Sequence, residues 1–127
     1  MNIAQYIRLY ADEEGESHFE DQAIDLVPVD FGPPAEPINH LQFLPVQQSF
    51  WLGAEMGWGG ETPHPSPRRQ ILCTVLGEYA VTASDGSRRS FPAGTVLLSE
   101  DTWGKGHSTQ VTSEAGFLIF GVTLAED

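Results

Sequence analysis

The stretch that decides the fold is His64-Pro65-Ser66-Pro67-Arg68-Arg69-Gln70, which is followed at once by the apolar run ILCTVL and by Gly77. Two prolines disfavour a regular element within the stretch, whereas the apolar run has the length and composition of a β-strand. We therefore predict that residues 64–70 form a tight corner that leads directly into a strand. His64 of this corner is expected at the mouth of a pocket.

Short β-type runs lie on both sides of this corner and are separated by turn residues. Ser84-Asp85-Gly86-Ser87 predicts a β-hairpin with a type I′ turn, because Asp-Gly tolerates positive φ. No window of useful length has helical periodicity. We expect an all-β jelly-roll barrel with strands over residues 2–10, 25–29, 38–44, 48–55, 71–76, 78–84, 95–99, 107–112 and 117–124.

The chain has 127 residues, a length that predicts one domain with a single core. Residues 11–21 are polar and acidic and predict a loop, and the three prolines of residues 31–37 predict an irregular crossing segment. We therefore expect residues 1–37 to form an N-terminal arm that wraps over a barrel made by residues 38–124.

The formal net charge of −12 excludes the most common binding classes. Nucleic-acid binding requires cations that displace phosphate counterions, and an anionic membrane surface would repel the chain in the same way. Much of the acidity lies in the first thirty residues, where we interpret it as a solvated rim. Four of the six cations form the pairs Arg68-Arg69 and Arg88-Arg89.

The cellular setting is expected to be the cytoplasm. No apolar run approaches the roughly 20 residues that span a bilayer, and the N-terminal residues lack the features of a signal peptide. Cys73 is the single cysteine and sits within an apolar run, so we expect a small buried hydrophobe and not a nucleophile.

Two spacings resemble the paired motifs of the cupin superfamily. The first motif, Gly-x5-His-x-His-x3–4-Glu-x6-Gly, is similar to the run from His64 through Gln70 to Gly77, with six residues between the last two. The match covers about residues 57–101 and implies a double-stranded β-helix with the site at its open end. The second motif, Gly-x5-Pro-x-Gly-x2-His-x3-Asn, resembles the run through Gly86, Pro92, Gly94, Leu97 and Asp101.

The cupin metal is held by three histidines and one glutamate, and this chain departs from that set. By position the resemblance retains only His64, because Ser66, Gln70 and Leu97 stand where the other ligands would be. Iron and zinc sites need at least three good ligands, so no cofactor is expected. A divalent metal held by His64, His107 and a third ligand from His18, His40 or a glutamate stays open.

The chain also resembles a group of short cupins with the stretches HPxPRRQ and EDTxGKGH, the second of which corresponds to residues 100–107. The resemblance implies no settled activity. It does imply a homodimer formed through the arm or through the edges of the barrels.

Two histidines are the candidate proton-transfer groups. An imidazole exchanges protons near neutral pH, and His64 faces the barrel interior if the motif alternation holds. His107 follows a Gly-Lys-Gly turn that could direct it toward the same interior. The alternatives are that His64 is a hydrogen-bonded remnant of a lost metal site and that His107 is a packed or surface residue.

The remaining candidates surround the expected pocket. Ser66 and Gln70 are neutral polar groups that need partners inside an apolar barrel, so a polar ligand is one natural partner. Glu100 is a candidate carboxylate beside a histidine, although Glu100 and Asp101 could instead cap a turn and pair with Lys105 or an arginine. The candidate ligand contacts are an Arg68 clamp for an anion, stacking by Trp51, and the apolar Leu97.

Three hypotheses about function follow. The first is a metal-independent isomerase, cyclase or lyase with His64, His107 and Glu100 as proton-transfer groups. The second is a non-catalytic module that binds or senses a small apolar ligand, and the third is a metal-dependent enzyme with an unorthodox histidine site. In each the partner is a small molecule, and the sequence does not identify it.

Overall fold

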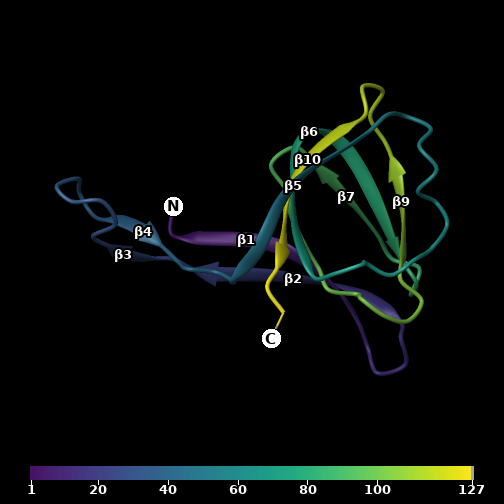
Figure 1. Ribbon diagram of the computed structural model, residues 1–127, viewed down its shortest axis with the longest axis horizontal. Helices are drawn as coiled ribbons and strands as arrows, with labels where there is room; N and C mark the ends of the chain where they lie inside the picture. The colour runs from purple at the N-terminus through teal and green to yellow at the C-terminus, as the bar shows by residue number, and fades with distance from the viewer. Residues whose placement is uncertain (127) are drawn as a thin grey trace.

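The computed structural model describes residues 1–126, and within them every regular element is a β-strand (Figure 1). This confirms the all-β prediction. No helix in this range is long and apolar enough to cross a membrane. The ten strands are β1 (Ile3–Ala11), β2 (Ser17–Asp25), β3 (Val27–Val29), β4 (Ile38–His40), β5 (Val46–Ala54), β6 (Gln70–Ala83), β7 (Arg88–Pro92), β8 (Val96–Ser99), β9 (His107–Val111) and β10 (Phe117–Leu124).

Strand β6 connects the two halves of the barrel-like body. Its first half pairs with β8 and β10, and its second half pairs with β7 and β9. We expected the strand to end at Gly77, but the strand continues and bends there, next to a register shift opposite Leu118 and Ile119. Gly77 has a φ of +73°, and an added Cβ would lie 1.8 Å from the carbonyl oxygen of Gly116. Only glycine fits this bend.

The main sheet is mixed and has the order β2-β1-β8-β6-β10-β5, with β7 and β9 paired to β6, whereas β3 and β4 form a separate two-stranded sheet. Side chains alternate between faces along each strand, and the inward ones form a single core. Tyr79 stacks on Phe91 with ring centroids 5.1 Å apart. Each fully buried apolar side chain contributes about 1.5–3 kcal/mol. The core comprises Leu9, Leu72, Tyr79, Val81, Ala83, Phe91, Leu97 and Ile119.

Part of the N-terminal segment that was expected to form an arm belongs to the main sheet. β1 pairs in parallel with β8 and antiparallel with β2, and Leu9 is fully buried in the core. The segment 11–21, expected to be a loop, contains the end of β1 and the first part of β2. The hairpin of β3 and β4 stands away from the body, beside the N-terminal end of β1 (Figure 1).

The hairpin predicted over residues 84–87 is present between β6 and β7, but its turn differs from the expected type I′. Gly86 has a φ of +92°, whereas no residue other than glycine has positive φ within the described chain. The Gly86 N–H donates to the Ala83 carbonyl at 3.0 Å. This is the three-residue loop in which a glycine follows a type I turn.

We predict that Gly77→Ala lowers the free energy of unfolding by about 3 kcal/mol or more, because it adds a backbone clash to an unfavourable φ. Gly94→Ala separates the two effects: Gly94 has a φ of +91°, but an added Cβ meets nothing within 4 Å. That variant should cost about 1–2 kcal/mol.

Urea denaturation of both variants measures the difference, with Gly59→Ala as a control that has neither problem. Equal losses for Gly77→Ala and Gly94→Ala would show that the approach of Gly116 does not constrain the bend.

Candidate functional site

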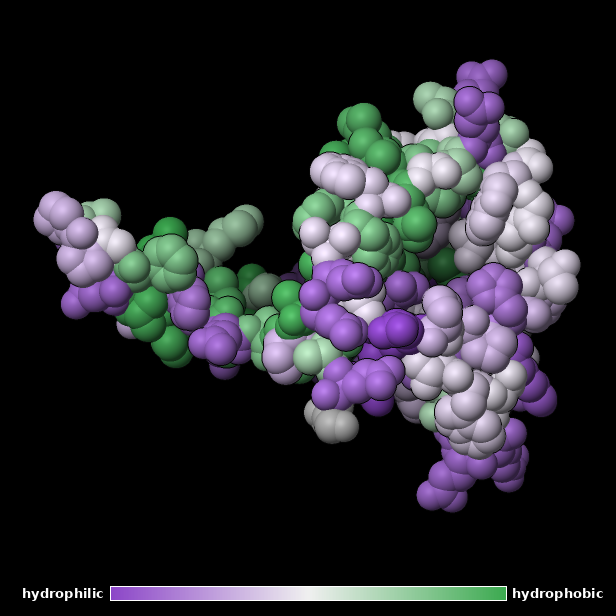
Figure 2. Space-filling view, viewed as in Figure 1, coloured by the Kyte–Doolittle hydropathy of each residue, from purple (hydrophilic) through white to green (hydrophobic). Residues whose placement is uncertain are grey.

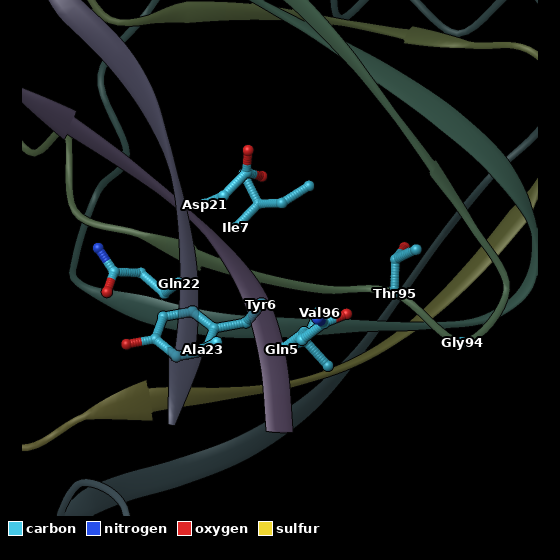
Figure 3. Close-up of a pocket in the computed structure, with 9 residues that line it drawn as sticks. All are labelled: Gln5, Tyr6, Ile7, Asp21, Gln22, Ala23, Gly94, Thr95 and Val96. Carbon is cyan, nitrogen blue, oxygen red and sulfur yellow. The ribbon is translucent and has the colours of Figure 1, made fainter. Parts of the chain in front are cut away.

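Two hollows are candidates for a site. The larger, of about 440 Å³, lies on β1 and β2 beside the turn at Gly94 (Figure 3). None of the nine residues around it is a histidine, and the carboxylate of Asp21 is already paired with Arg89 at 2.8 Å. This hollow has room for a ligand but offers little chemistry, so we take the smaller hollow as the candidate site.

The smaller hollow is a cavity of about 130 Å³ inside the barrel. It is similar in volume to a cavity of about 150 Å³ that holds benzene in another protein. Its wall is mainly apolar, with two histidines and a few neutral polar groups. The lining residues are Leu52, Trp58, His64, Gln70, Leu72, Tyr79, Val81, Leu97, Ser99, His107, Thr109, Phe117 and Ile119.

The predicted corner brings His64 and His107 together. Each donates its backbone N–H to the carbonyl of the other at 3.0 Å, and their ring centroids are 5.4 Å apart. Gly106 permits this approach, because its φ is +71° and an added Cβ would lie 2.1 Å from the carbonyl carbon of His64. His107 is buried and His64 is exposed, so the pair extends from the interior to the surface.

A buried carboxylate holds the His107 ring. Asp101 is fully buried, and its Oδ2 accepts a hydrogen bond from His107 Nδ1 at 2.5 Å. Its Oδ1 accepts from the hydroxyls of Ser66 at 3.0 Å and Ser99 at 3.2 Å. These two hydroxyls also contact each other. The carboxylate therefore has three donors, as a buried anion requires.

This arrangement suits His107 to act as a base. Because Nδ1 donates to Asp101, the neutral ring carries its lone pair on Nε2, which has no hydrogen-bond partner among residues 1–126. A carboxylate on one ring nitrogen fixes the tautomer and stabilises the imidazolium formed when the other nitrogen takes a proton. The base lines an apolar cavity next to a second histidine.

Four of the sequence-predicted residues line this cavity: His64, His107, Gln70 and Leu97. Ser66 was expected to contact the ligand, but it is buried behind Ser99, and its hydroxyl donates a hydrogen bond to Asp101. It therefore holds the carboxylate in place. The catalytic and ligand-binding roles of the four lining residues remain predictions.

Glu100 was expected to be a catalytic carboxylate, but it does not line the cavity. Its two oxygens accept from Arg8 Nε at 2.6 Å and from Arg69 Nε at 2.7 Å. Successive residues of an extended chain point to opposite sides, so Asp101 faces inward and Glu100 faces outward. Glu100 thus joins β1 to the corner that precedes β6.

Arg68 and Trp51 also lie outside the cavity. The Arg68 side chain is exposed and donates to Gln47 Oε1 at 3.2 Å. Trp51 packs against Phe120 at a ring-centroid distance of 4.9 Å on the outer face of the sheet, and its neighbour Leu52 is the residue that lines the cavity. Neither expected ligand contact is therefore at this site.

The role of Asp101 and the wall formed by Trp58, Tyr79 and Phe117 were not predicted from the sequence. Asp101 was expected to pair with Lys105 or an arginine, but Lys105 pairs with Glu16 at 2.5 Å. The alternation along β8 could have identified Asp101, since it continues the inward series from Leu97 through Ser99.

The other two histidines lie elsewhere. His18 bridges Asp12 at 2.7 Å and Asp85 at 2.9 Å, and the His40 ring packs on Phe31 with centroids 5.2 Å apart. Neither reaches the cavity, so the three-histidine metal site considered above is not assembled. Among residues 1–126, no three His, Cys, Asp or Glu side chains are grouped as metal ligands.

Comparisons with known proteins leave the interpretation to the site itself. No protein-family model matches the sequence, and no curated protein matches it either. The chemistry of the cavity is therefore argued from its own residues.

We predict that Glu100→Gln lowers the free energy of unfolding by about 1–3 kcal/mol, because it removes the charge that two arginines share in a largely buried position. Chemical denaturation tests this, with Glu61→Gln, an exposed position, as the control. An unchanged unfolding midpoint would contradict the conclusion that Glu100 connects β1 to the corner before β6.

We predict that His18 makes stability depend on pH near neutrality. Hydrogen bonds to Asp12 and then to Asp85 raise the pKa of His18 above its ordinary value. A group whose pKa is raised on folding makes its full contribution to stability at pH values below its unfolded-state pKa. This contribution is lost as pH rises through the folded-state pKa. Exposed pairs of this kind contribute about 0.2–1 kcal/mol.

Urea midpoints of the wild type and of His18→Gln, measured on both sides of neutral pH, test this. The variant should be less stable than the wild type in acid, and the difference should vanish in base. If the difference in stability between the two proteins does not change with pH, the ion pairs of His18 with Asp12 and Asp85 do not stabilise the fold.

Proposed function

We propose that this protein is a cupin-type barrel that transfers a proton within a small, neutral molecule without a metal. The observation that carries the proposal is the buried Asp101 carboxylate on Nδ1 of His107, at the wall of an apolar cavity. The same pairing of carboxylate and imidazole prepares the general base in many unrelated enzymes.

The backbone supports the cupin resemblance and a double-stranded β-helix. Three glycines of the proposed motif framework, Gly77, Gly86 and Gly94, have φ values of +73°, +92° and +91°. Positive φ is a conformation that other residues rarely adopt. The glycines of the framework thus lie where the chain bends or turns.

The residues at the metal-ligand positions of the resemblance do not fit a metal. Leu97 is apolar and lies in the core, and the Ser66 hydroxyl is bound to Asp101. Only His64 and the neutral Gln70 are left, and iron or zinc needs at least three good ligands. We therefore base the chemistry on proton transfer alone.

In the proposed reaction, His107 Nε2 takes a proton from a carbon or hydroxyl of the bound molecule, and Asp101 stabilises the resulting imidazolium. His64, when protonated, returns a proton to another atom of the same molecule. Both rings line the cavity, with centroids 5.4 Å apart. Such a pair supports isomerisation, cyclisation or elimination, depending on which bond breaks.

The lining also limits the substrate. The cavity of about 130 Å³ suits a small, planar aromatic molecule. Neither arginine nor lysine is among its lining residues, so a carboxylate or phosphate would find no counter-charge there. Gln70 and Thr109 offer neutral hydrogen bonds. A small uncharged molecule with one or two oxygen atoms fits best.

Turnover of 5-nitrobenzisoxazole tests the base directly. A base removes its C3 proton while the N–O bond breaks, and 2-cyano-4-nitrophenolate is released and followed by its absorbance. We predict turnover by the wild type, with a loss of at least about 100-fold in kcat/KM for His107→Gln and a clear loss for Asp101→Asn. His18→Gln, a histidine outside the cavity, is the control and should keep the wild-type rate.

Equal rates for the wild type and His107→Gln would contradict the proposal. Binding of the probe, measured by quenching of the intrinsic tryptophan fluorescence, combined with no turnover above buffer would instead favour the ligand-binding hypothesis. The apolar lining supports that second function equally well.

A further inference from the structure

The buried hydroxyl of Tyr79 is a polar group that the proposed reaction does not use. Among residues 1–126 it is the one buried side-chain oxygen or nitrogen without a hydrogen-bond partner. Tyr79 is 2% exposed and lines the cavity of the candidate site. The neighbouring Thr74 hydroxyl accepts from Thr95 Oγ1 at 3.4 Å instead. Buried polar groups are almost always hydrogen-bonded, because an unsatisfied donor costs free energy. A partner from outside the chain is therefore expected at Tyr79.

The Tyr79 ring is held in place by aromatic neighbours. It stacks on Phe91 with ring planes inclined by 15° and centroids 5.1 Å apart, and Phe117 packs against it with centroids 5.2 Å apart. A phenylalanine at position 79 would make the same ring contacts, so packing of the core does not account for the hydroxyl. Close packing by the two neighbours also restricts the ring, which keeps the hydroxyl from turning toward a different partner.

Tyr79 and His107 line different ends of the cavity. In the pairing of β6 with β9, His107 is opposite Ala83 and Val111 is opposite Tyr79. Four residues of a strand span roughly 13 Å, and residues two or four apart face the same side. His64 pairs with His107, so both candidate proton-transfer groups lie at one end and Tyr79 at the other. Figure 2 shows a recess in the barrel-like body with apolar residues inside it, as entry of an apolar molecule requires.

We propose that Tyr79 donates a hydrogen bond to an oxygen atom of the molecule bound in the cavity, at the end of that molecule remote from His107. The inference rests on the proposed function for the place where the molecule binds. Burial raises the pKa of the Tyr79 hydroxyl, which therefore stays protonated and acts as a donor. With neither arginine nor lysine among the lining residues, an uncharged acceptor is favoured. The substrate class is thereby narrowed to planar aromatic compounds with a carbonyl or ether oxygen.

Isothermal titration calorimetry with benzaldehyde and styrene tests the proposal, because the two molecules have nearly the same planar shape and only benzaldehyde has an acceptor oxygen. We expect the wild type to bind benzaldehyde at least about tenfold more tightly than styrene, and Tyr79→Phe to bind both with similar affinity. Tyr6→Phe is the matched control, because Tyr6 does not line the cavity, and it should keep the wild-type preference. Without ligand, Tyr79→Phe should raise the urea midpoint, since it removes a buried donor that has no partner among the described residues.

Equal affinities of the wild type for the two probes, as expected if a trapped water satisfies the hydroxyl, would overturn the proposal. So would a preference for benzaldehyde that persists in Tyr79→Phe, or a lower urea midpoint for this variant, which would show that the protein itself satisfies the hydroxyl. Neither probe has a proton for His107 to transfer, so the result is independent of turnover. Loss of the preference in Tyr79→Phe supports the role of Tyr79 even if His107→Gln turns over 5-nitrobenzisoxazole at the wild-type rate.

Discussion

The burial of the Asp101 carboxylate is the constraint on which the arrangement of the site depends. Removing a carboxylate from water costs several kcal/mol unless hydrogen bonds replace the lost hydration. Asp101 receives those hydrogen bonds from three separate segments: the corner through Ser66, the end of β8 through Ser99, and the start of β9 through His107. The backbone N–H of Ser66 also donates to the Asp101 carbonyl at 2.9 Å. Losing any one donor would leave the charge less well solvated, so the three segments are held together.

The fold could be predicted largely because it depends on local features. Glycines with positive φ and short apolar runs fixed most of the strands, and the run 117–124 is the strand β10. The loop predicted over residues 11–21 was wrong because the segment contains part of β2, which is an edge strand. Glu20 and Asp21 keep access to solvent there, while Phe19 packs against the core, so the composition of β2 is that of a loop although each of its residues pairs with β1.

The site was harder to predict because it depends on which of two adjacent residues faces inward. Glu100 and Asp101 are both carboxylates, and Trp51 and Leu52 are both apolar. In each pair, however, one residue reaches the interior and the other does not. A shift of one residue reverses such an assignment. The meeting of His64 with His107 could not be derived from local sequence at all, since a pairing between residues far apart in the chain produces it.

The distribution of charge separates the scaffold from the site. Arg8, Arg69, Arg89 and Lys105 all pair with carboxylates. Three of these four pairs, together with the bridge from His18 to Asp85, attach residues 1–25 to the rest of the barrel. Exposed pairs are individually weak and are screened by salt, so the acidic segment is held by several small contributions added to the packing of Leu9. Three of the six lysines and arginines serve this attachment, and no lysine or arginine lines the cavity, so the charged or chargeable groups at the cavity are the Asp101–His107 pair and His64. In the proposed reaction, the imidazolium formed at His107 would lie against the Asp101 carboxylate, an arrangement that favours proton uptake from a neutral molecule over the binding of an anion.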